Sequence, residues 1–246
     1  MAMPTPVERG SLTSQQTALC ATVVLEFHGL CDQVDGTQME ATSLILATGI
    51  RDRVPPVEDA WSRIRDGLIR QCPVCDAFEV IDKHVAVIGA GDCAAGEALF
   101  LRPYTLDVVL VTIGKPLDVS NDVARKLADA GIRLETAPVE RWDFNDRGVT
   151  LHLQDQAPNF FAAVYSGLGN DPQNVLAWEL HLSLSDDGRI LTDAKQETSV
   201  SNVFAAGDVV TGLNQIAVAM AQGEIAATQV HNMLRQREGR TLANDE

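Results

Sequence analysis

The stretch "VAVIGAGDCA", from Val85 to Ala94, decides the fold that we expect for this chain. Its first four residues are apolar and predict a buried strand, glycines follow, and a helical pattern begins near Asp92. In a GxGxxA turn the first glycine permits the tight turn, the second lets a pyrophosphate approach the backbone, and the alanine allows close packing of helix and strand. We therefore predict that Gly89, Gly91 and Ala94 bind a dinucleotide; the alternative is a glycine turn in an α/β sheet without a ligand.

The segments after this turn indicate a parallel sheet. Residues 106–114 and 132–137 are predicted strands, and between them Ser120 is expected to cap a helix that ends at Gly131. This βαβαβ order is typical of a parallel sheet with helices on its faces. A hairpin is predicted to turn at 146–148, and a last strand follows it.

The end of the second strand should indicate which dinucleotide is preferred. An acidic residue there binds the ribose of NAD, and a nearby arginine accepts the 2′-phosphate of NADP. This chain has Thr112 at that place and Lys115 somewhat later, so neither rule is satisfied. NAD(P)H remains a possible cofactor, but no residue at this strand end distinguishes NADH from NADPH.

The stretch "QCPVCDAFEV", from Gln71 to Val80, contains Cys72 and Cys75 as a CxxC pair. A zinc site would need a second such pair, which the sequence lacks, so we predict no metal site. A structural disulfide is disfavoured in a cytosolic chain. A redox dithiol is the favoured interpretation, in which one thiolate attacks a substrate disulfide and the other resolves the mixed disulfide. Asp76 either moves protons at these sulfurs or is only a turn or cap residue.

The chain on either side of this region predicts a second set of elements. Val23, Leu25 and Phe27 alternate as in a half-buried strand, and the polar stretch 50–60 with its two prolines is a linker candidate. The other predicted elements are strands at 44–47, 188–193 and 202–209 and a long helix at 214–238.

Gly207 and Asp208 follow a predicted buried strand, and a helix begins near Gln215, Ile216 and Ala217. A carboxylate at this place can bind sugar-like hydroxyls, and the helix N-terminus can bind an electron-rich carbonyl edge of a ring. The alternative is a strand-to-helix turn with an aspartate cap.

The charge balance is acidic, since 19 Lys and Arg against 34 Asp and Glu give a net charge of −15. We therefore expect neither nucleic acid nor a membrane surface as a partner. The sequence shows no secretory signal and no apolar stretch near the roughly 18 residues of a membrane span, which predicts a cytoplasmic protein. Cys93, on the helix after the glycine turn, is expected to be a small core residue.

Four motifs, in this order, resemble the low-molecular-weight thioredoxin reductase family: "LILATG", "CPVCD", "VAVIGAGDCAAGEALFL" and "TSVSNVFAAGDV" with "NQIAVAMAQG" after it. The resemblance implies an α/β fold with two Rossmann-like domains. An FAD domain at 1–53 and 165–246, incomplete at its N-terminus, would be interrupted by a pyridine-nucleotide domain at 54–164 that carries the CxxC pair.

The resemblance also implies a site and partners. Cys72 and Cys75 would exchange electrons with the flavin, and Asp76 would be the acid/base. The expected partner is a thioredoxin-like protein or a small dithiol or disulfide, and homodimers are typical of the family. The residues implied to bind FAD are Thr48 and Gly49 near the cofactor, Gly207 and Asp208 at the ribityl chain, and Gln215, Ile216 and Ala217 along the flavin ring.

Two features depart from the family. Its basic cluster for the 2′-phosphate of NADPH is replaced by residues 112–115, as in a branch of thiol oxidases in which oxygen can be the electron acceptor. Its opening βαβ unit, which takes roughly 30 residues and carries a GxGxxG turn, is not found before the first predicted strand. We therefore expect an N-terminal truncation, a partner that supplies this half, or loss of FAD. The alternative function is a degenerate, non-enzymatic nucleotide-binding or interaction module.

Overall fold

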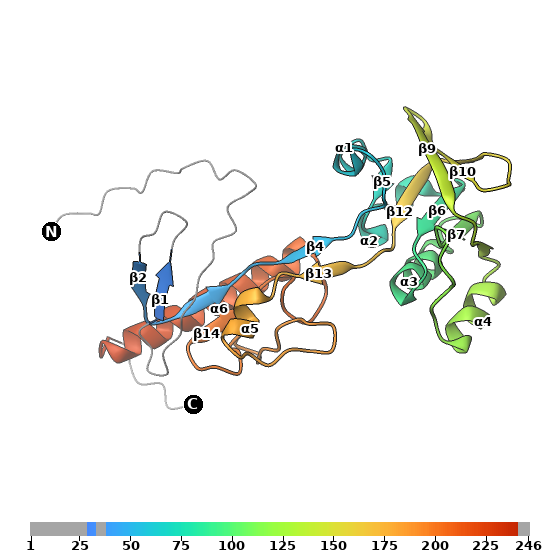
Figure 1. The fold of residues 1–246 in the computed structure, drawn as a ribbon. Helices are drawn as coiled ribbons and strands as arrows, with labels where there is room; N and C mark the ends of the chain where they lie inside the picture. The colour runs from blue at the N-terminus through green and yellow to red at the C-terminus, as the bar shows by residue number, and fades with distance from the viewer. Residues whose placement is uncertain (1–28, 33–37, 241–246) are drawn as a thin grey trace. The chain divides into compact units, whose positions relative to one another are not determined.

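The computed structural model of this chain describes residues 29–32 and 38–240. The alternating Val23, Leu25 and Phe27 lie outside the described residues. The chain divides into two compact units (Figure 1). We name the units by their place in the sequence. The inner unit is residues 51–171, and the outer unit is the residues up to 50 together with those from 172. The predicted α/β fold class is confirmed.

The inner unit is built on a five-stranded sheet in which all neighbouring strands are parallel. The strands lie in the order β5 (Ile69–Arg70), β12 (Ala163–Ser166), β6 (Val85–Ile88), β7 (Val108–Val111) and β8 (Arg133–Glu135). Helix α3 (Asp92–Leu101) joins β6 to β7, and α4 (Asn121–Asp129) joins β7 to β8, as predicted. Ser120 caps α4, because its Oγ accepts a 3.3 Å hydrogen bond from the Val123 amide.

The sheet is buried on both faces, which explains why its central strand is a continuous apolar run. Val85 and Val87 of β6 pack in one cluster with Ala94 of α3. Ala86 and Ile88 point to the other face, where they pack against strand β10 (Gly148–Leu153).

An antiparallel sheet of the order β11 (Asn159–Phe161), β10 and β9 (Val139–Asn145) covers this second face. The predicted hairpin is confirmed, since Gly148 pairs with Asn145 and the chain turns between them. Before β6 the inner unit has helix α1 (Ala60–Arg65), the one-turn helix α2 (Pro73–Asp76) and the 3₁₀ turn η1 (Ala77–Val80).

The outer unit has short strand pairs and one long helix. Strand β3 pairs in parallel with β14, β1 pairs with β2, and β4 pairs with β13 where the chain passes between the units. The bounds are β1 (Gly29–Asp32), β2 (Gln38–Ala41), β3 (Leu44–Leu46), β4 (Ile50–Asp52), β13 (Asn170–Pro172), α5 (Val175–Glu179), β14 (Val203–Ala205) and α6 (Ile216–Arg237).

One expectation for these segments was wrong. The strand predicted at 188–193 is an isolated bridge at Ile190, because only this residue finds backbone partners on both sides, Leu184 and Val210. The linker candidate at 50–60 contains the boundary between the two units, which lies after Ile50, although its first residues form strand β4.

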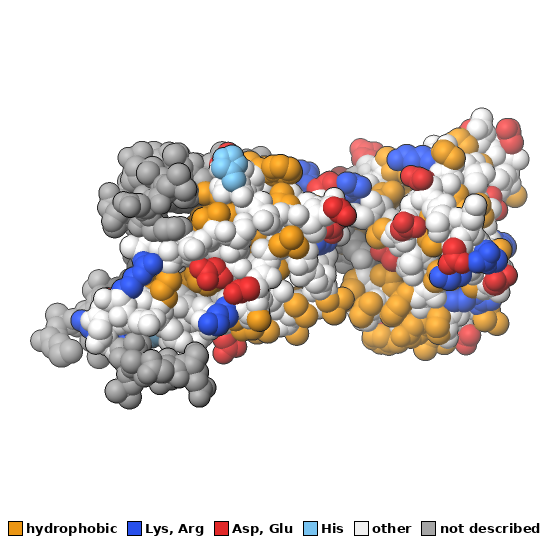
Figure 2. Space-filling model, turned by 90° about the horizontal axis from the view of Figure 1, so that it is seen from below, with side chains coloured by type: hydrophobic (Ala, Val, Ile, Leu, Met, Phe, Trp, Pro, Cys, Tyr) orange, Lys and Arg blue, Asp and Glu red, His pale blue; other side chains and the backbone are white. Residues whose placement is uncertain are grey.

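The surface carries both signs of charge. Figure 2 shows acidic and basic side chains interspersed over the face in view, without a continuous basic patch there. Within the described part of the chain, no helix is long and apolar enough to cross a bilayer.

Candidate functional site

The CxxC pair lies at the one-turn helix α2. Cys72 is the N-cap, Pro73 occupies the first helical position, where a missing amide costs nothing, and the Cys75 amide donates a 2.9 Å hydrogen bond to the Cys72 carbonyl. This turn brings the two Cα atoms to 5.3 Å, and the sulfurs are joined as a disulfide. Of the two residues, Cys75 is exposed and Cys72 is partly buried.

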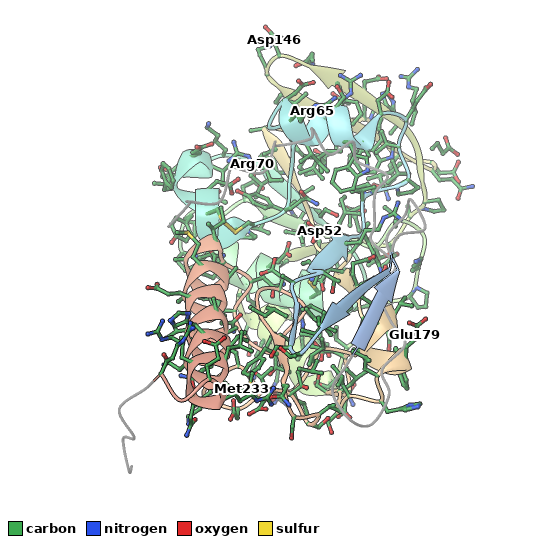
Figure 3. All side chains as sticks on the ribbon, turned by 90° about the vertical axis from the view of Figure 1, so that its left-hand side faces the viewer. Asp52, Arg65, Arg70, Asp146, Glu179 and Met233 are labelled. Carbon is green, nitrogen blue, oxygen red and sulfur yellow. A yellow bond between two sulfur atoms is a disulfide. The ribbon has the colours of Figure 1, made fainter. Side chains whose placement is uncertain are left out.

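Asp76, the residue after the pair, is held by two donors. The Tyr165 hydroxyl donates a 2.8 Å hydrogen bond to Oδ1 of Asp76, and Nη1 of Arg70 lies 3.2 Å from Oδ2. The same guanidinium pairs with Glu79 at 2.8 Å. Arg70 and the disulfide can be followed in Figure 3. Sequence reasoning identified Asp76 but missed Arg70 and Tyr165.

The strand register explains why these two residues meet. Tyr165 of β12 is the partner of Arg70 of β5 in the parallel ladder, so both side chains lie on the same face of the sheet. Burial, together with the bond to Asp76, raises the pKa of Tyr165, so the phenol keeps its proton. Burial disfavours the charge of Arg70, but Asp76 and Glu79 outweigh burial and raise the pKa of Arg70.

Large apolar side chains stand exposed near the disulfide. Val74, between the two cysteines, and Phe78 and Ile81, just after them, are each more than half exposed. Exposed apolar groups gathered in one segment indicate a surface that contacts another molecule.

The glycine turn lies at the carboxyl end of β6. Gly89 has a φ of +147°, and a Cβ there would lie 2.6 Å from the Gly167 carbonyl oxygen and 2.7 Å from the Ala94 Cβ. A Cβ on Gly91 would meet only the Asp118 carbonyl oxygen at 3.8 Å. Gly91 is also the N-cap of α3, and a glycine has no side chain that could cap the first amides of this helix.

A cavity of about 640 Å³ opens beside this turn. Such a volume suits a small-molecule site. It is lined by residues from the ends of β6, β7 and β12, among them Gly89, Gly91, Thr112, Lys115, Gly167 and Asn170.

At the end of β7 the cavity wall is a tight turn. Thr112 is fully buried, and its hydroxyl donates a 2.5 Å hydrogen bond to the Lys115 carbonyl. Ile113 and Gly114 between them have φ values of 49° and 79°. The Asp118 amide donates to the Ala90 carbonyl at 2.7 Å, which ties this loop to the glycine turn.

Cys93 was wrongly expected in the core. Ala94, Ala95 and Ala98 take the core face of α3, so position 93 lies on the cavity side and is exposed. Its thiol donates to Oε1 of Glu97 at 3.7 Å. Partial burial raises the pKa of Glu97 to about 7. Partial burial of the Cys93 thiol beside Glu97 raises the pKa of this thiol to about 11, so it stays protonated near neutral pH.

In the outer unit, the two predicted turns leave the same edge of a sheet. Leu46 of β3 pairs with Ala205 of β14, and Thr48-Gly49 and Gly207-Asp208 follow these strands. Thr48 Oγ1 donates a 2.5 Å bond to the Gln173 carbonyl. The Gly207 amide donates to Gln222 Oε1 at 2.8 Å, which fixes this turn against α6.

The predicted helix begins at Ile216, after Gln215 as N-cap. Asp208 is therefore not its cap, and Gln215 makes no capping bond through its side chain. Leu213, Ile216 and Met220 are each more than half exposed around this helix start. The start of α6 therefore combines the backbone N–H groups of its first turn with an apolar surface.

A sequence model of the family described as "Pyridine nucleotide-disulphide oxidoreductase" matches residues 11–223. The chain belongs to this family. The resemblance to thioredoxin reductases is confirmed as well: this oxidoreductase is 29% identical over 81% of its length to a thioredoxin reductase of Peptoclostridium litorale and 33% identical over 80% to one of Neurospora crassa. It covers 67% and 63% of these relatives, so it spans about two thirds of their length.

A solved structure agrees with the sequence comparison. The thioredoxin reductase of Streptococcus pyogenes matches with a TM-score of 0.73 and 25% identity, over 85% of this oxidoreductase and 70% of the other chain.

Proposed function

We propose that this chain passes electron pairs between FAD and a protein or small-molecule disulfide through Cys72 and Cys75. In this proposal the outer unit is part of an FAD domain and the inner unit is the pyridine-nucleotide domain. One observation carries the proposal: the Cys72–Cys75 disulfide, with Cys75 at an exposed position, is followed directly by Asp76, whose carboxylate is bound by Tyr165.

The exchange can be written with the residues of this chain. A substrate thiolate attacks Sγ of the exposed Cys75, the bond between the two cysteine sulfurs breaks, and Cys72 leaves as a thiolate. The second substrate thiol then attacks the mixed disulfide, which releases the oxidised substrate. The cysteines gain the two electrons, and Asp76 moves a proton between the sulfurs and solvent. The reverse sequence reduces a substrate disulfide.

The residues of the outer unit fit the flavin end of FAD. The uncapped start of α6 offers amides to the carbonyl edge of a ring, and exposed Leu213, Ile216 and Met220 offer an apolar surface to its face. Asp208 and Thr48 would bind hydroxyl groups. Bound FAD would supply two-electron transfer. Among the described residues of this unit, none form a second GxGxxA turn for the pyrophosphate.

The cavity beside Gly89 and Gly91 fits the pyrophosphate of a pyridine nucleotide at the start of α3. Thr112 turns its hydroxyl to the Lys115 carbonyl, so this strand end presents neither the carboxylate typical of NAD sites nor an arginine for NADP. The proposed electron donor is therefore NADH or NADPH without strong preference.

The exposed Val74, Phe78 and Ile81 support a substrate with an apolar surface next to its disulfide, such as a thioredoxin-like protein. Following the resemblance, we also propose that the protein acts in the cytoplasm as a homodimer.

Thiol counting tests this function. The full chain is reduced, freed of reductant, and reoxidised with a small disulfide, and its thiols are counted before and after. We expect the wild type and Cys93→Ser to lose a pair of thiols without retaining the reagent, whereas the lone Cys75 of Cys72→Ser should retain the reagent as a mixed disulfide. If Cys72→Ser lost as many thiols as the wild type, the redox assignment would be wrong and the non-enzymatic module would stand in its place.

A further inference from the structure

The carboxyl group of Asp76 is bound on both oxygens. Tyr165, which lies 89 positions later in the chain, binds one oxygen, and Arg70 of strand β5 binds the other. We propose that Arg70 and Tyr165 are positioning residues that hold the ionised Asp76 carboxylate in one orientation beside the Cys72–Cys75 pair. This inference rests on the proposed function, because it assigns a task to the proton carrier of that reaction.

Tyr165 is suited to this task because it has no alternative partner in solvent. Its side chain is fully buried, in a core cluster with Ala77 and Val80 of η1, the turn that directly follows Asp76. The Tyr165 ring therefore packs against η1, while its hydroxyl donates a hydrogen bond to Oδ1 of Asp76. A phenol that keeps its proton donates to a carboxylate oxygen, so this bond fixes the direction in which the carboxyl group points.

Arg70 adds a charge to the other oxygen. Its side chain is 15% exposed, so its ion pair with Asp76 is less screened than a surface pair. Glu79 shares this guanidinium and fixes it from η1. The charged and titratable groups that face Asp76 are Arg70 of β5, Glu79 of η1, Tyr165 of β12 and the cysteine pair itself.

An ionised, oriented carboxylate is a proton acceptor. When the reduced pair attacks a disulfide, the attacking thiol must lose its proton, and Asp76 is the neighbouring group that can take it. Removing either donor leaves the carboxyl group free to turn away from the neighbouring thiols, so proton transfer to it becomes slower. The rate of attack should then be lower than in the wild type at the same pH.

The reaction of the reduced full chain with 4,4′-dithiodipyridine tests this without any cofactor. The two cysteine thiols give up two electrons and two protons, the disulfide Cys72–Cys75 forms, and the reagent is released as two thiopyridone molecules. Cys20, Cys31 and Cys93 are replaced by serine in every chain compared, because each further thiol would bind the reagent and release one thiopyridone. The rate is measured for each chain at the same neutral pH.

We expect Tyr165→Phe to lower the rate about tenfold, and Arg70→Gln to lower it at least as far. Arg70→Lys, which keeps the charge, should restore most of the wild-type rate. Tyr104→Phe is the matched control, since Tyr104 is the only other tyrosine of the chain and stacks on Phe100 instead.

Thermal unfolding of each variant separates positioning from folding. If Tyr165→Phe and Arg70→Gln lowered the melting temperature but left the rate unchanged, while Asp76→Asn lowered the rate, the positioning role would be refuted and the proposed function would stand. If Cys72→Ser left the reaction with the reagent unchanged, the proposed function itself would fail.

Discussion

The hydroxyl of Tyr165 donates a 2.8 Å hydrogen bond to Asp76, a residue 89 positions earlier in the chain. Tyr165 also pairs with Arg70 in the ladder between β12 and β5, and Arg70 binds the other oxygen of the same carboxyl. One strand register therefore assembles both donors at the residue that follows the disulfide.

The two glycines of the turn after β6 should respond differently to substitution by alanine. Gly89→Ala places a Cβ 2.6 Å from a carbonyl oxygen at positive φ, so we expect a loss of about 2 kcal/mol or more in the free energy of unfolding. Gly91→Ala meets no atom closer than 3.8 Å and should fold normally, but its methyl group blocks the approach of a pyrophosphate. Urea unfolding and calorimetric titration with NADH and NADPH measure both effects.

Gly96→Ala is the control for these variants, because Gly96 lies within α3 and a Cβ there meets nothing within 4 Å. It should raise stability by about 0.5–1 kcal/mol and leave nucleotide binding unchanged. Equal nucleotide affinities of Gly91→Ala and Gly96→Ala would rule out pyrophosphate binding at this turn.

Glu97 should make stability depend on pH. Its pKa is about 7 in the folded chain, above the ordinary value of 4.5, because burial disfavours the charge. The folded state therefore binds more protons than the unfolded state between these values, and stability falls as the pH rises through this window. Glu97→Gln removes the buried charge and should be more stable than the wild type at pH 8 by about 1–3 kcal/mol, with little difference at pH 4.

Denaturant unfolding at the two pH values checks this expectation. Glu140→Gln, at an exposed position of β9, should show no such pH-dependent gain. A Glu97→Gln variant that is less stable than the wild type at pH 8 would show that the carboxylate is stabilised in the fold.

Phe78 should matter for a protein substrate and not for a small one. Phe78→Ser removes an exposed ring near the disulfide, so it should leave the melting temperature almost unchanged and lower the rate with oxidised thioredoxin about tenfold. Its rate with 4,4′-dithiodipyridine should match the wild type. Leu106→Ser, at another exposed apolar position, is the control. Equal rates of both variants with thioredoxin would point to a small-molecule disulfide instead.

The order of elements around the glycine turn could be predicted because its signals are local. The buried run of β6, the Ser120 cap and the hairpin after β9 each depend on neighbouring residues, and each was predicted correctly. The donors to Asp76 could not be predicted, because their meeting depends on which strands are adjacent in the sheet. The position of Cys93 was missed for a related reason, since the alanines beside it, not its own polarity, set the core face of α3.

The most direct test of the central claim is the reduction of added FAD on the full chain by dithiothreitol, followed by absorbance without oxygen. We predict that the wild type and Cys93→Ser bind FAD and lose its flavin absorbance within the time of disulfide reduction, whereas Cys75→Ser keeps it. Loss of the flavin absorbance at the same rate in Cys75→Ser, or no uptake of FAD by the wild type, would contradict electron transfer from Cys72 and Cys75 to FAD.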